Sequence, residues 1–260
     1  MNGRKNRRDV FSLAGRVALV TGGSRGIGRA TSEMLAGAGA RVVVHFRARE
    51  AEAARVVRGI ARAGGQATAV GADLADPEQT AALVEETVRL YGRLDVLVNN
   101  AGIWEAGPLL TMTPAQWRRT MAINLDSVFY GTQAAARVMK RQRSGRIVSV
   151  SSTAGQRGEA GYSHYAATKG AVISLTKSWA VELAPWGIYV NCVAPGWVDT
   201  DMTAAELRGR AGRAIARAIP LGRVGAPRDI AAAILFLASE ACGFVTGEIL
   251  NVNGGAVLCG

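Results

Sequence analysis

The sequence predicts an α/β protein built on one doubly wound parallel sheet of about seven strands, with helices on both faces. Three observations support this fold class. Short runs rich in β-branched residues alternate along the chain with longer segments of helical periodicity. The 260 residues, 49% of them hydrophobic, are enough for one large domain. No internal repeat, linker or composition break divides them.

Each strand is predicted from a short β-branched run, and each helix from the longer pattern that follows it. The strands are expected at 16–21, 41–46, 67–72, 94–99, 146–151, 188–194 and 248–253. The helices are expected at 27–38, 50–63, 77–91, 114–142, 162–184, 202–217 and 227–239. Two helix starts are marked by a proline at the first helical position, Pro77 and Pro114. Ligands of such sheets bind beyond the carboxyl ends of the strands, so the segments after each strand are the candidate site.

The basic N-terminal segment and the length of the hydrophobic runs limit the classes of protein to which this chain can belong. Residues 1–14 are expected to be a basic tail, and residues 15–260 a single catalytic domain. The tail lacks the apolar core and cleavage site of a signal peptide. The longest apolar stretch, 230–238, is far shorter than the ~20 residues that span a bilayer. We therefore expect a cytoplasmic protein without membrane contact.

The cysteines and histidines give no sign of a metal site. Cys192, Cys242 and Cys259 are far apart, and no CxxC or Cys/His cluster exists. This argues against a disulfide framework and against structural zinc, and it fits a reducing compartment. His45 and His164 are isolated, and we expect them to be structural or surface residues.

The formal net charge of +11 admits more than one interpretation. The basic residues concentrate in the tail and in segments 41–62, 140–146 and 208–228. Nucleic-acid binding is disfavoured because no recognition motif accompanies the charge. An arginine-rich solvated surface is the simpler interpretation, and an acidic partner or a phosphorylated ligand remains open.

A glycine-rich loop follows the first predicted strand. Residues 21–30 read TGGSRGIGRA, with glycines at 22, 26 and 28. Glycine lets the backbone approach a pyrophosphate closely, and the start of a helix favours its negative charge. The spacing differs from the GxGxxG fingerprint. The prediction of a phosphate-binding loop therefore depends on its position between a strand and a helix.

The end of the second strand indicates which dinucleotide this loop would bind. A carboxylate there holds the ribose hydroxyls of NAD, whereas arginine accommodates the 2′-phosphate of NADP. This chain has no carboxylate before Glu50 and places Arg47 beside the expected position. Arg25 in the glycine loop supplies a second positive charge. We therefore predict NADP(H) as the cofactor.

The later strand ends carry a set of motifs in a fixed order. These are NNAG at 99–102, Asn124, a serine pair at 151–152, Tyr165 four residues before Lys169, and APGWVDT at 194–200. In this order and spacing the chain resembles the short-chain dehydrogenase/reductase family, from about Arg16 to Gly255. The resemblance implies a Rossmann-like fold and an enzyme that interconverts a carbonyl and a secondary alcohol.

The resemblance also implies four catalytic residues. Tyr165 would protonate the carbonyl oxygen, and Ser152 would hydrogen-bond it. Lys169, on the same helical face as Tyr165, would bind the nicotinamide ribose and lower the pKa of the phenol. Asn124 would hold a water that links Lys169 to solvent.

The glycine loop, the arginines and the family motifs together predict the cofactor-binding residues, and no metal site. These are Gly22, Ser24, Arg25, Gly26, Ile27, Gly28, Arg47, Asp73, Leu74, Asn100, Ala101, Gly102, Tyr165, Lys169, Pro195, Gly196, Val198 and Thr200.

The C-terminal third most resembles the 3-oxoacyl-[acyl-carrier-protein] reductase branch of the family. Trp104, Ser152 and Trp197 are expected to line the substrate pocket. Arg143 matches one of two arginines that dock the carrier protein in that branch, but Trp186 stands in place of the other. The resemblance further implies a homotetramer formed through helices 114–142 and 162–184 and the last strand. Two alternatives stay open: a reductase of a free ketone, sugar or polyketide, and a non-catalytic NADP(H)-binding sensor.

Overall fold

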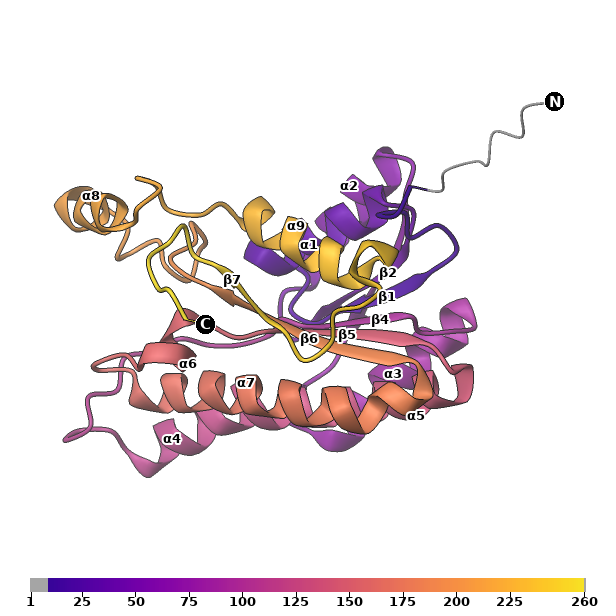
Figure 1. Ribbon diagram of the computed structural model, residues 1–260, viewed down its shortest axis with the longest axis horizontal. Coiled ribbons are helices and arrows are strands. Elements are labelled where there is room, and N and C mark those ends of the chain that lie inside the picture. The colour runs from indigo at the N-terminus through magenta and orange to yellow at the C-terminus, as the bar shows by residue number, and fades with distance from the viewer. Residues whose placement is uncertain (1–8, 260) are drawn as a thin grey trace.

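A seven-stranded parallel sheet forms the centre of the computed structural model, which describes residues 9–259. The strand order is β3-β2-β1-β4-β5-β6-β7, so the chain winds outward from β1 in both directions. Figure 1 shows α1, α2 and α9 above the sheet and α3, α5 and α7 below it. The predicted fold class is confirmed.

The strands and helices have the following bounds. The strands are β1 (Val17–Val20), β2 (Arg41–Phe46), β3 (Gln66–Gly71), β4 (Val96–Asn99), β5 (Gly145–Val150), β6 (Ile188–Pro195) and β7 (Ile249–Val252). The α-helices are α1 (Gly26–Gly37), α2 (Glu50–Arg62), α3 (Pro77–Tyr91), α4 (Pro114–Met121), α5 (Ser127–Gln142), α6 (Thr153–Arg157), α7 (Ser163–Leu183), α8 (Gly209–Ala218) and α9 (Pro227–Ala238). A π-helical turn η1 (Ala122–Asp126) and two 3₁₀ turns, η2 (Ala184–Trp186) and η3 (Glu240–Cys242), complete the elements.

The central strands are buried on both faces, as parallel strands covered by helices must be. All four residues of β1 are buried, and they contribute to the cores on the two sides of the sheet. One core joins the sheet to α1, α2 and α9 through residues such as Leu35 and Ile234. The other joins it to α3 and α5 through Leu83 and Met139. Two filled cores hold the carboxyl ends of the strands in fixed positions.

The two prolines mark helix starts as predicted. Asp76 caps α3 by accepting hydrogen bonds from the N–H groups of Glu78 and Gln79. Thr113 and Gln116 form a capping box at the start of α4. Each arrangement satisfies N–H groups that have no partner inside the helix.

Two predicted helices differ from the observed ones. The helix expected at 114–142 is interrupted by the π turn η1. The helix expected at 202–217 begins only at Gly209. In the segment before it, the Thr203 hydroxyl donates to the carbonyl of Val198, and the Thr203 N–H donates to Thr200. Such local bonds compete with helix formation and hold a turn. The short helix α6 was not predicted.

The structure describes only the last part of the predicted tail, from residue 9 to residue 14. Its first eight residues lie outside the described residues. Leu13, at the end of the predicted tail, is 3% exposed and its N–H donates to the Ala38 carbonyl at 2.7 Å. The boundary between tail and domain therefore stays a prediction.

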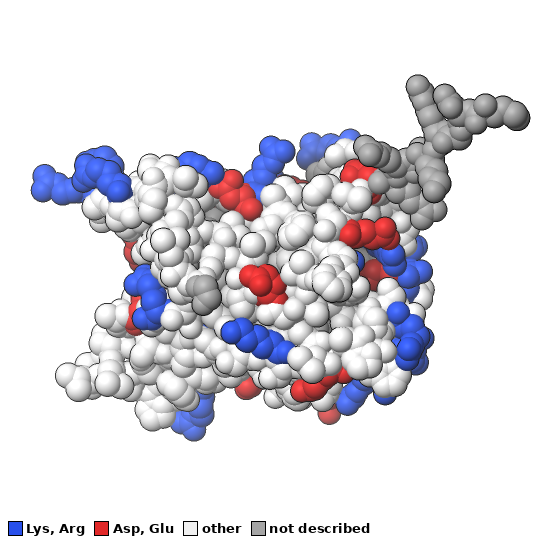
Figure 2. Space-filling model, in the orientation of Figure 1, with Lys and Arg blue, Asp and Glu red and all other residues white. Residues whose placement is uncertain are grey.

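The charged residues are distributed over several elements. Figure 2 shows blue and red side chains interspersed on this face, with blue projecting at the end of the molecule that carries α8 in Figure 1. Arg210, Arg213 and Arg217 lie on that helix. Within residues 9–259, no helix is long and apolar enough to cross a membrane, and no group of three or more His, Cys, Asp or Glu residues could hold a metal ion.

Candidate active site

A cavity of about 400 Å³ lies beyond the carboxyl ends of the strands. Every residue predicted to bind the cofactor lines this cavity, and so does Ser152. Asn124, Trp104 and Trp197 were also predicted as site residues, but they are not among the described residues that line it. The cavity also has lining residues that the sequence did not indicate: His45, Phe46, Ala48, Arg49, Ala75, Ile103, Arg119, Ile123, Val150, Ser151, Asp201, Met202 and Thr203.

The glycine loop forms one wall of the cavity with its backbone. Gly22 and Gly26 adopt positive φ angles of 60° and 51°, which side chains disfavour. A Cβ atom on Gly28 would overlap the carbonyl oxygen of Gly22, so only glycine fits there. No described side chain caps the start of α1, and its first turn carries no acidic residue. The N–H groups of that turn are therefore suited to a phosphate.

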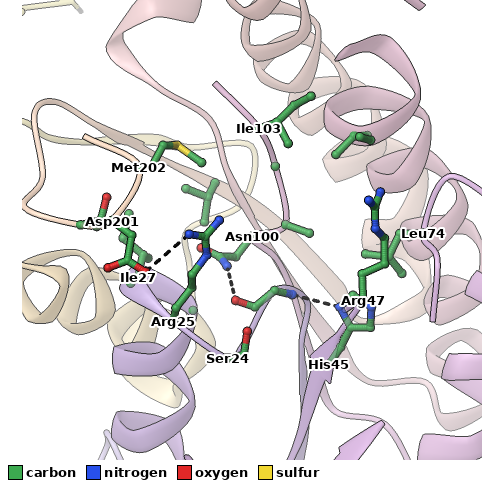
Figure 3. Close-up of a pocket in the computed structure, with 18 of the residues that line it drawn as sticks. Ser24, Arg25, Ile27, His45, Arg47, Leu74, Asn100, Ile103, Asp201 and Met202 are labelled. Carbon is green, nitrogen blue, oxygen red and sulfur yellow. Dashed lines mark hydrogen bonds and ion pairs between the residues drawn. The ribbon is translucent and has the colours of Figure 1, made fainter. Parts of the chain in front are cut away.

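His45 fixes the position of this loop. Its Nδ1 accepts a hydrogen bond from the Gly22 N–H at 3.0 Å, as Figure 3 shows. Because Gly22 can only donate, the proton lies on Nε2, which donates to the Ala72 carbonyl at 3.1 Å. Burial lowers the pKa of His45, so the ring stays neutral. The expectation that His45 is structural fits this position, but the sequence did not indicate that it supports the glycine loop.

Asn100 and Thr21 join the next strand end to the same loop. The Asn100 side chain donates to the carbonyls of Thr21 and Gly22 at 2.9 and 3.2 Å. The Thr21 hydroxyl accepts from the N–H groups of Asn100 and Ala101 at 2.8 and 3.1 Å. These bonds hold the NNAG segment, which begins at the end of β4, at a fixed distance from the glycine loop.

Arg25 and Arg47 reach the cavity from two different strand ends. Arg25 lies 3.5 Å from Asp201, and Figure 3 shows the two side chains pointing toward each other. Arg47 lies 4.0 Å from Asp73. The arginine side chains are 42% and 56% exposed. Exposed pairs of this kind are weak, so an anionic ligand can compete for both guanidinium groups.

Ser152 and Tyr165 meet where β5 ends and α7 begins. Ser152 caps α6, its hydroxyl accepting from the Ala154 N–H at 3.1 Å. The same hydroxyl lowers the pKa of Tyr165 through a hydrogen bond. Ser151 is committed elsewhere, because its hydroxyl donates to the Lys169 carbonyl at 2.7 Å. This agrees with the preference for Ser152 over Ser151.

The pKa values of Tyr165 and Lys169 differ from the sequence-based expectation. Burial, with a smaller effect of the Glu159 charge, raises the pKa of Tyr165 to about 12. Burial lowers the pKa of Lys169 to about 8. The Lys169 ammonium lies 5.7 Å from the Tyr165 ring centroid and donates to the Val150 carbonyl at 2.7 Å. Desolvation is the largest effect on both groups, and the lowering of the phenol pKa by Lys169 stays a prediction.

Asn124 lies in the π turn and not on the cavity wall. Its side chain accepts from the Ile103 N–H and donates to the Ile103 carbonyl, both at 2.8 Å. The Asn124 oxygen and the Lys169 Nζ both lie near Gly102, 3.3 and 3.8 Å from an ideal Cβ there. Both polar ends of the amide are used, so this side chain positions the segment after β4. A water held by Asn124 stays a prediction.

Trp104 and Trp197 pack together beside the cavity. Their ring centroids are 5.8 Å apart in an edge arrangement, and Trp104 also stacks on Tyr162. Both tryptophans adjoin cavity residues in sequence, namely Ile103 and Val198. Their predicted contact with substrate stays a prediction.

The predicted carrier-docking position is occupied by a cation–π cluster. The Trp186 ring lies under Lys140 at 4.1 Å and under Arg143 at 5.1 Å, measured to its centroid. Arg143 ends α5 in the left-handed conformation, with φ 56°. Two cations thus gather on an aromatic surface that also covers the end of α7.

Comparison with known proteins shows consistent similarity along the chain. The family described as Enoyl-(Acyl carrier protein) reductase, a group of short-chain dehydrogenases/reductases, matches residues 22–257. A 3-oxoacyl-[acyl-carrier-protein] reductase of Synechocystis is 43% identical over 96% of this chain and 100% of the relative. A reductase of the same name from Vibrio cholerae is 43% identical over 94% of this chain and 98% of the relative.

Solved structures agree with this similarity. A dehydrogenase/reductase from Sinorhizobium meliloti is 41% identical, with a TM-score of 0.90 over 96% of this chain and 98% of the other. A putative NAD(P)-dependent gluconate 5-dehydrogenase from Beutenbergia cavernae, solved with bound NADP, has the same identity and TM-score over 95% and 98% of the two chains.

Proposed function

The chain belongs to the short-chain dehydrogenase/reductase family, and we propose that it reduces a 3-oxoacyl thioester to the 3-hydroxyacyl form with NADPH. Family membership makes the protein an oxidoreductase that depends on a nicotinamide dinucleotide. The observation that carries the proposal is the meeting of Ser152, Tyr165 and Lys169 in a cavity lined by every predicted cofactor residue. The printed names of the relatives support the thioester as substrate.

The cavity fits a dinucleotide by its own geometry. The glycine loop and the start of α1 would hold the pyrophosphate, and Asp73 and Leu74 would lie beside the adenine. Pro195, Val198 and Thr200 would hold the nicotinamide side, with Lys169 on its ribose. The cofactor supplies the hydride when bound, and the protein supplies orientation and the proton.

We infer a preference for NADPH over NADH from the two arginines. Arg47 lies beside Asp73 and Arg25 beside Asp201, and neither arginine has a strong partner. A charge-assisted Arg–phosphate bond to the 2′-phosphate is stronger than either exposed ion pair. The solved relative with bound NADP supports the same choice. Arg47→Asp should shift the kcat/KM ratio of NADPH to NADH by about tenfold or more toward NADH, and an unchanged ratio would refute the role of Arg47.

Proton transfer in the proposed reaction belongs to Tyr165. A pKa of about 12 keeps the phenol protonated at neutral pH, which is the form that can act as an acid. Ser152 would hydrogen-bond the substrate oxygen from the other side. As the hydride reaches the carbonyl carbon, the oxygen would take the Tyr165 proton, and Lys169 would stabilise the phenolate left behind.

Partner binding is part of the proposal. The cations around Trp186 would face an acidic carrier protein, with Arg143 contributing as predicted. Association of copies is supported by apolar side chains exposed on the two long helices: Phe129 is 42% exposed and Val181 is 78% exposed. We propose a tetramer, and light scattering that shows a monomer at micromolar concentration would contradict it.

A free polyhydroxylated ketone is the second candidate substrate. The relative titled gluconate 5-dehydrogenase favours it, as do the acceptor groups of Glu159 and Glu206 near Tyr162. A non-catalytic sensor is disfavoured, because Ser152, Tyr165 and Lys169 are all present and meet in one cavity.

The test follows NADPH oxidation with 3-oxoacyl groups on CoA and on acyl carrier protein, beside a panel of free ketones and polyhydroxy ketones. The proposal expects a higher kcat/KM for the thioesters, with the carrier-bound form the higher of the two. Turnover confined to free ketones would refute the thioester and keep the carbonyl chemistry.

A further inference from the structure

Three aromatic side chains adjoin the cavity beside the catalytic tyrosine. Trp104 directly follows Ile103, and Trp197 lies between Gly196 and Val198, all three neighbours being cavity residues. Tyr162 stands three residues before Tyr165, which places it near the same side of the start of α7. The chain therefore places these three residues at the border of the cavity that holds Tyr165 and Ser152. We call Trp104, Tyr162 and Trp197 the aromatic cluster.

The aromatic cluster is closely packed. The rings of Trp104 and Tyr162 are stacked, with centroids 4.5 Å apart and planes 11° from parallel. Trp197 meets Trp104 edge-on at 5.8 Å and 88°. These are the arrangements that aromatic pairs prefer. Rings in such contact leave no space between them for an alkyl chain.

Two carboxylates lie next to the cluster. Burial raises the pKa of Glu159, which Trp104 beside it partly lowers, and burial followed by the charges of Glu206 and Glu159 raises the pKa of Tyr162. One oxygen of Glu206, Oε2, is fully buried without a hydrogen-bond partner among the described residues. An alkyl chain that displaced the rings would place apolar groups against these carboxylates, which is unfavourable. The cluster is thus both a steric and an electrostatic boundary.

We propose that the aromatic cluster limits the length of the acyl group, so that the enzyme reduces short 3-oxoacyl chains in preference to long ones. The thioester part of this inference rests on the proposed function, but the length limit applies to any ketone that reaches Tyr165. Trp104, Tyr162 and Trp197 are then specificity-determining residues of this chain.

The first test compares 3-oxobutanoyl and 3-oxodecanoyl thioesters on the wild-type enzyme. In an open apolar channel each buried methylene strengthens binding by about fourfold, so the longer chain would give the higher kcat/KM. The length limit predicts the opposite order, with the 3-oxobutanoyl thioester favoured by about tenfold or more. An equal or higher kcat/KM for the 3-oxodecanoyl thioester would overturn the inference.

Variants of the aromatic cluster test whether these side chains set the limit on acyl-chain length. Trp197→Ala should raise the ratio of long-chain to short-chain kcat/KM by about tenfold, because it removes the edge-on ring and leaves the stacked pair of Trp104 and Tyr162. Trp104→Leu serves the same purpose if Trp197→Ala does not fold. The matched control is Trp117→Ala, a tryptophan on α4 that is 44% exposed and lies outside the cavity. The assignment is contradicted if the ratio of long-chain to short-chain kcat/KM changes equally in Trp117→Ala. It is also contradicted if this ratio changes in neither Trp197→Ala nor Trp104→Leu.

The free methyl ketones 2-butanone and 2-octanone separate this inference from the proposed function. If no thioester is reduced but 2-butanone is favoured over 2-octanone, the thioester function fails and the length limit stands. If thioesters of all lengths are reduced equally, the function stands and the length limit fails.

Discussion

The two sides of the cavity are built in different ways. The cofactor side consists mainly of backbone: the glycine loop, the uncapped start of α1, and the strand ends tied together by His45 and Asn100. The proposed substrate side, at the border of the cavity, consists of side chains from separate segments, with Trp104, Tyr162 and Trp197 packed ring against ring. Backbone geometry depends on glycine and on element boundaries, which a sequence displays. Ring packing depends on tertiary contacts, which it does not.

This difference has a functional meaning. A dinucleotide presents the same phosphates and rings to every enzyme that uses it, so one rigid backbone cradle suffices. Substrates vary, and bulky side chains on loops can change without disturbing the sheet. The following predictions test this division at the catalytic centre, on the cofactor side and at Lys169. They ask which changes affect turnover and which affect NADPH binding.

The largest effect is expected at the junction of the two sides. Tyr165→Phe removes the proton donor and should lower kcat by about 10³-fold or more, since positioned acids contribute about 10² to 10⁴. NADPH affinity, measured by fluorescence titration, should change little because the ring remains. Tyr130→Phe makes the same change on α5, away from the cavity, and should leave kcat unaltered. Retained turnover in Tyr165→Phe would refute the assignment of the acid.

A smaller effect is expected on the cofactor side. Gly28→Ala places a methyl group against the Gly22 carbonyl and must displace the glycine loop. The Kd for NADPH should rise by about tenfold or more, the usual result of an overpacked contact. Gly37→Ala is the matched control, because it lies in the same helix and an added Cβ there meets nothing within 4 Å. Equal NADPH affinity in the two variants would show that binding does not depend on the close contact between Gly28 and the Gly22 carbonyl.

The third effect is a dependence on pH, which is small near neutrality and grows above pH 8. The pKa of Lys169 is lowered to about 8 by burial, so its ammonium form is lost as pH rises through that value. Because kcat/KM reports the free enzyme, its value for NADPH should fall by about tenfold per pH unit above this point. Tyr165, with a pKa of about 12, stays protonated throughout that range. A profile that stays flat from pH 7 to 10 would contradict a functional charge on Lys169.

The sequence predicted the cofactor side well for a physical reason. The loop glycines at 22, 26 and 28, the two arginines Arg25 and Arg47, and residues 100–102 of the NNAG segment lie at the ends of strands whose positions follow from hydrophobic runs, and these residues line the cavity. His45 was the omission on this side. Its role requires β2 to lie between β1 and β3, so that the ring reaches the Gly22 N–H on one side and the Ala72 carbonyl on the other, and no local pattern contains that information.

The substrate side was less predictable. The helix expected from residue 202 is replaced by turns up to Gly209, because the Thr203 side chain bonds to the chain preceding it. Tyr162 was not among the predicted site residues, although it completes the aromatic cluster. The spacing of Tyr165 and Lys169 placed both on one face, yet burial and not their mutual charge sets their pKa values. Spacing shows which side chains are close, and burial depends on the complete fold.

The most direct test of the central claim is to follow a deuterium label from the nicotinamide. The enzyme would be incubated with NADPH deuterated at C4 and with a 3-oxoacyl or a 2-enoyl thioester, and the products examined by mass spectrometry. The account predicts a 3-hydroxyacyl thioester with one deuterium on the carbinol carbon, formed by the wild type and not by Tyr165→Phe. A saturated acyl product from the enoyl thioester alone, or an unlabelled alcohol, would contradict it.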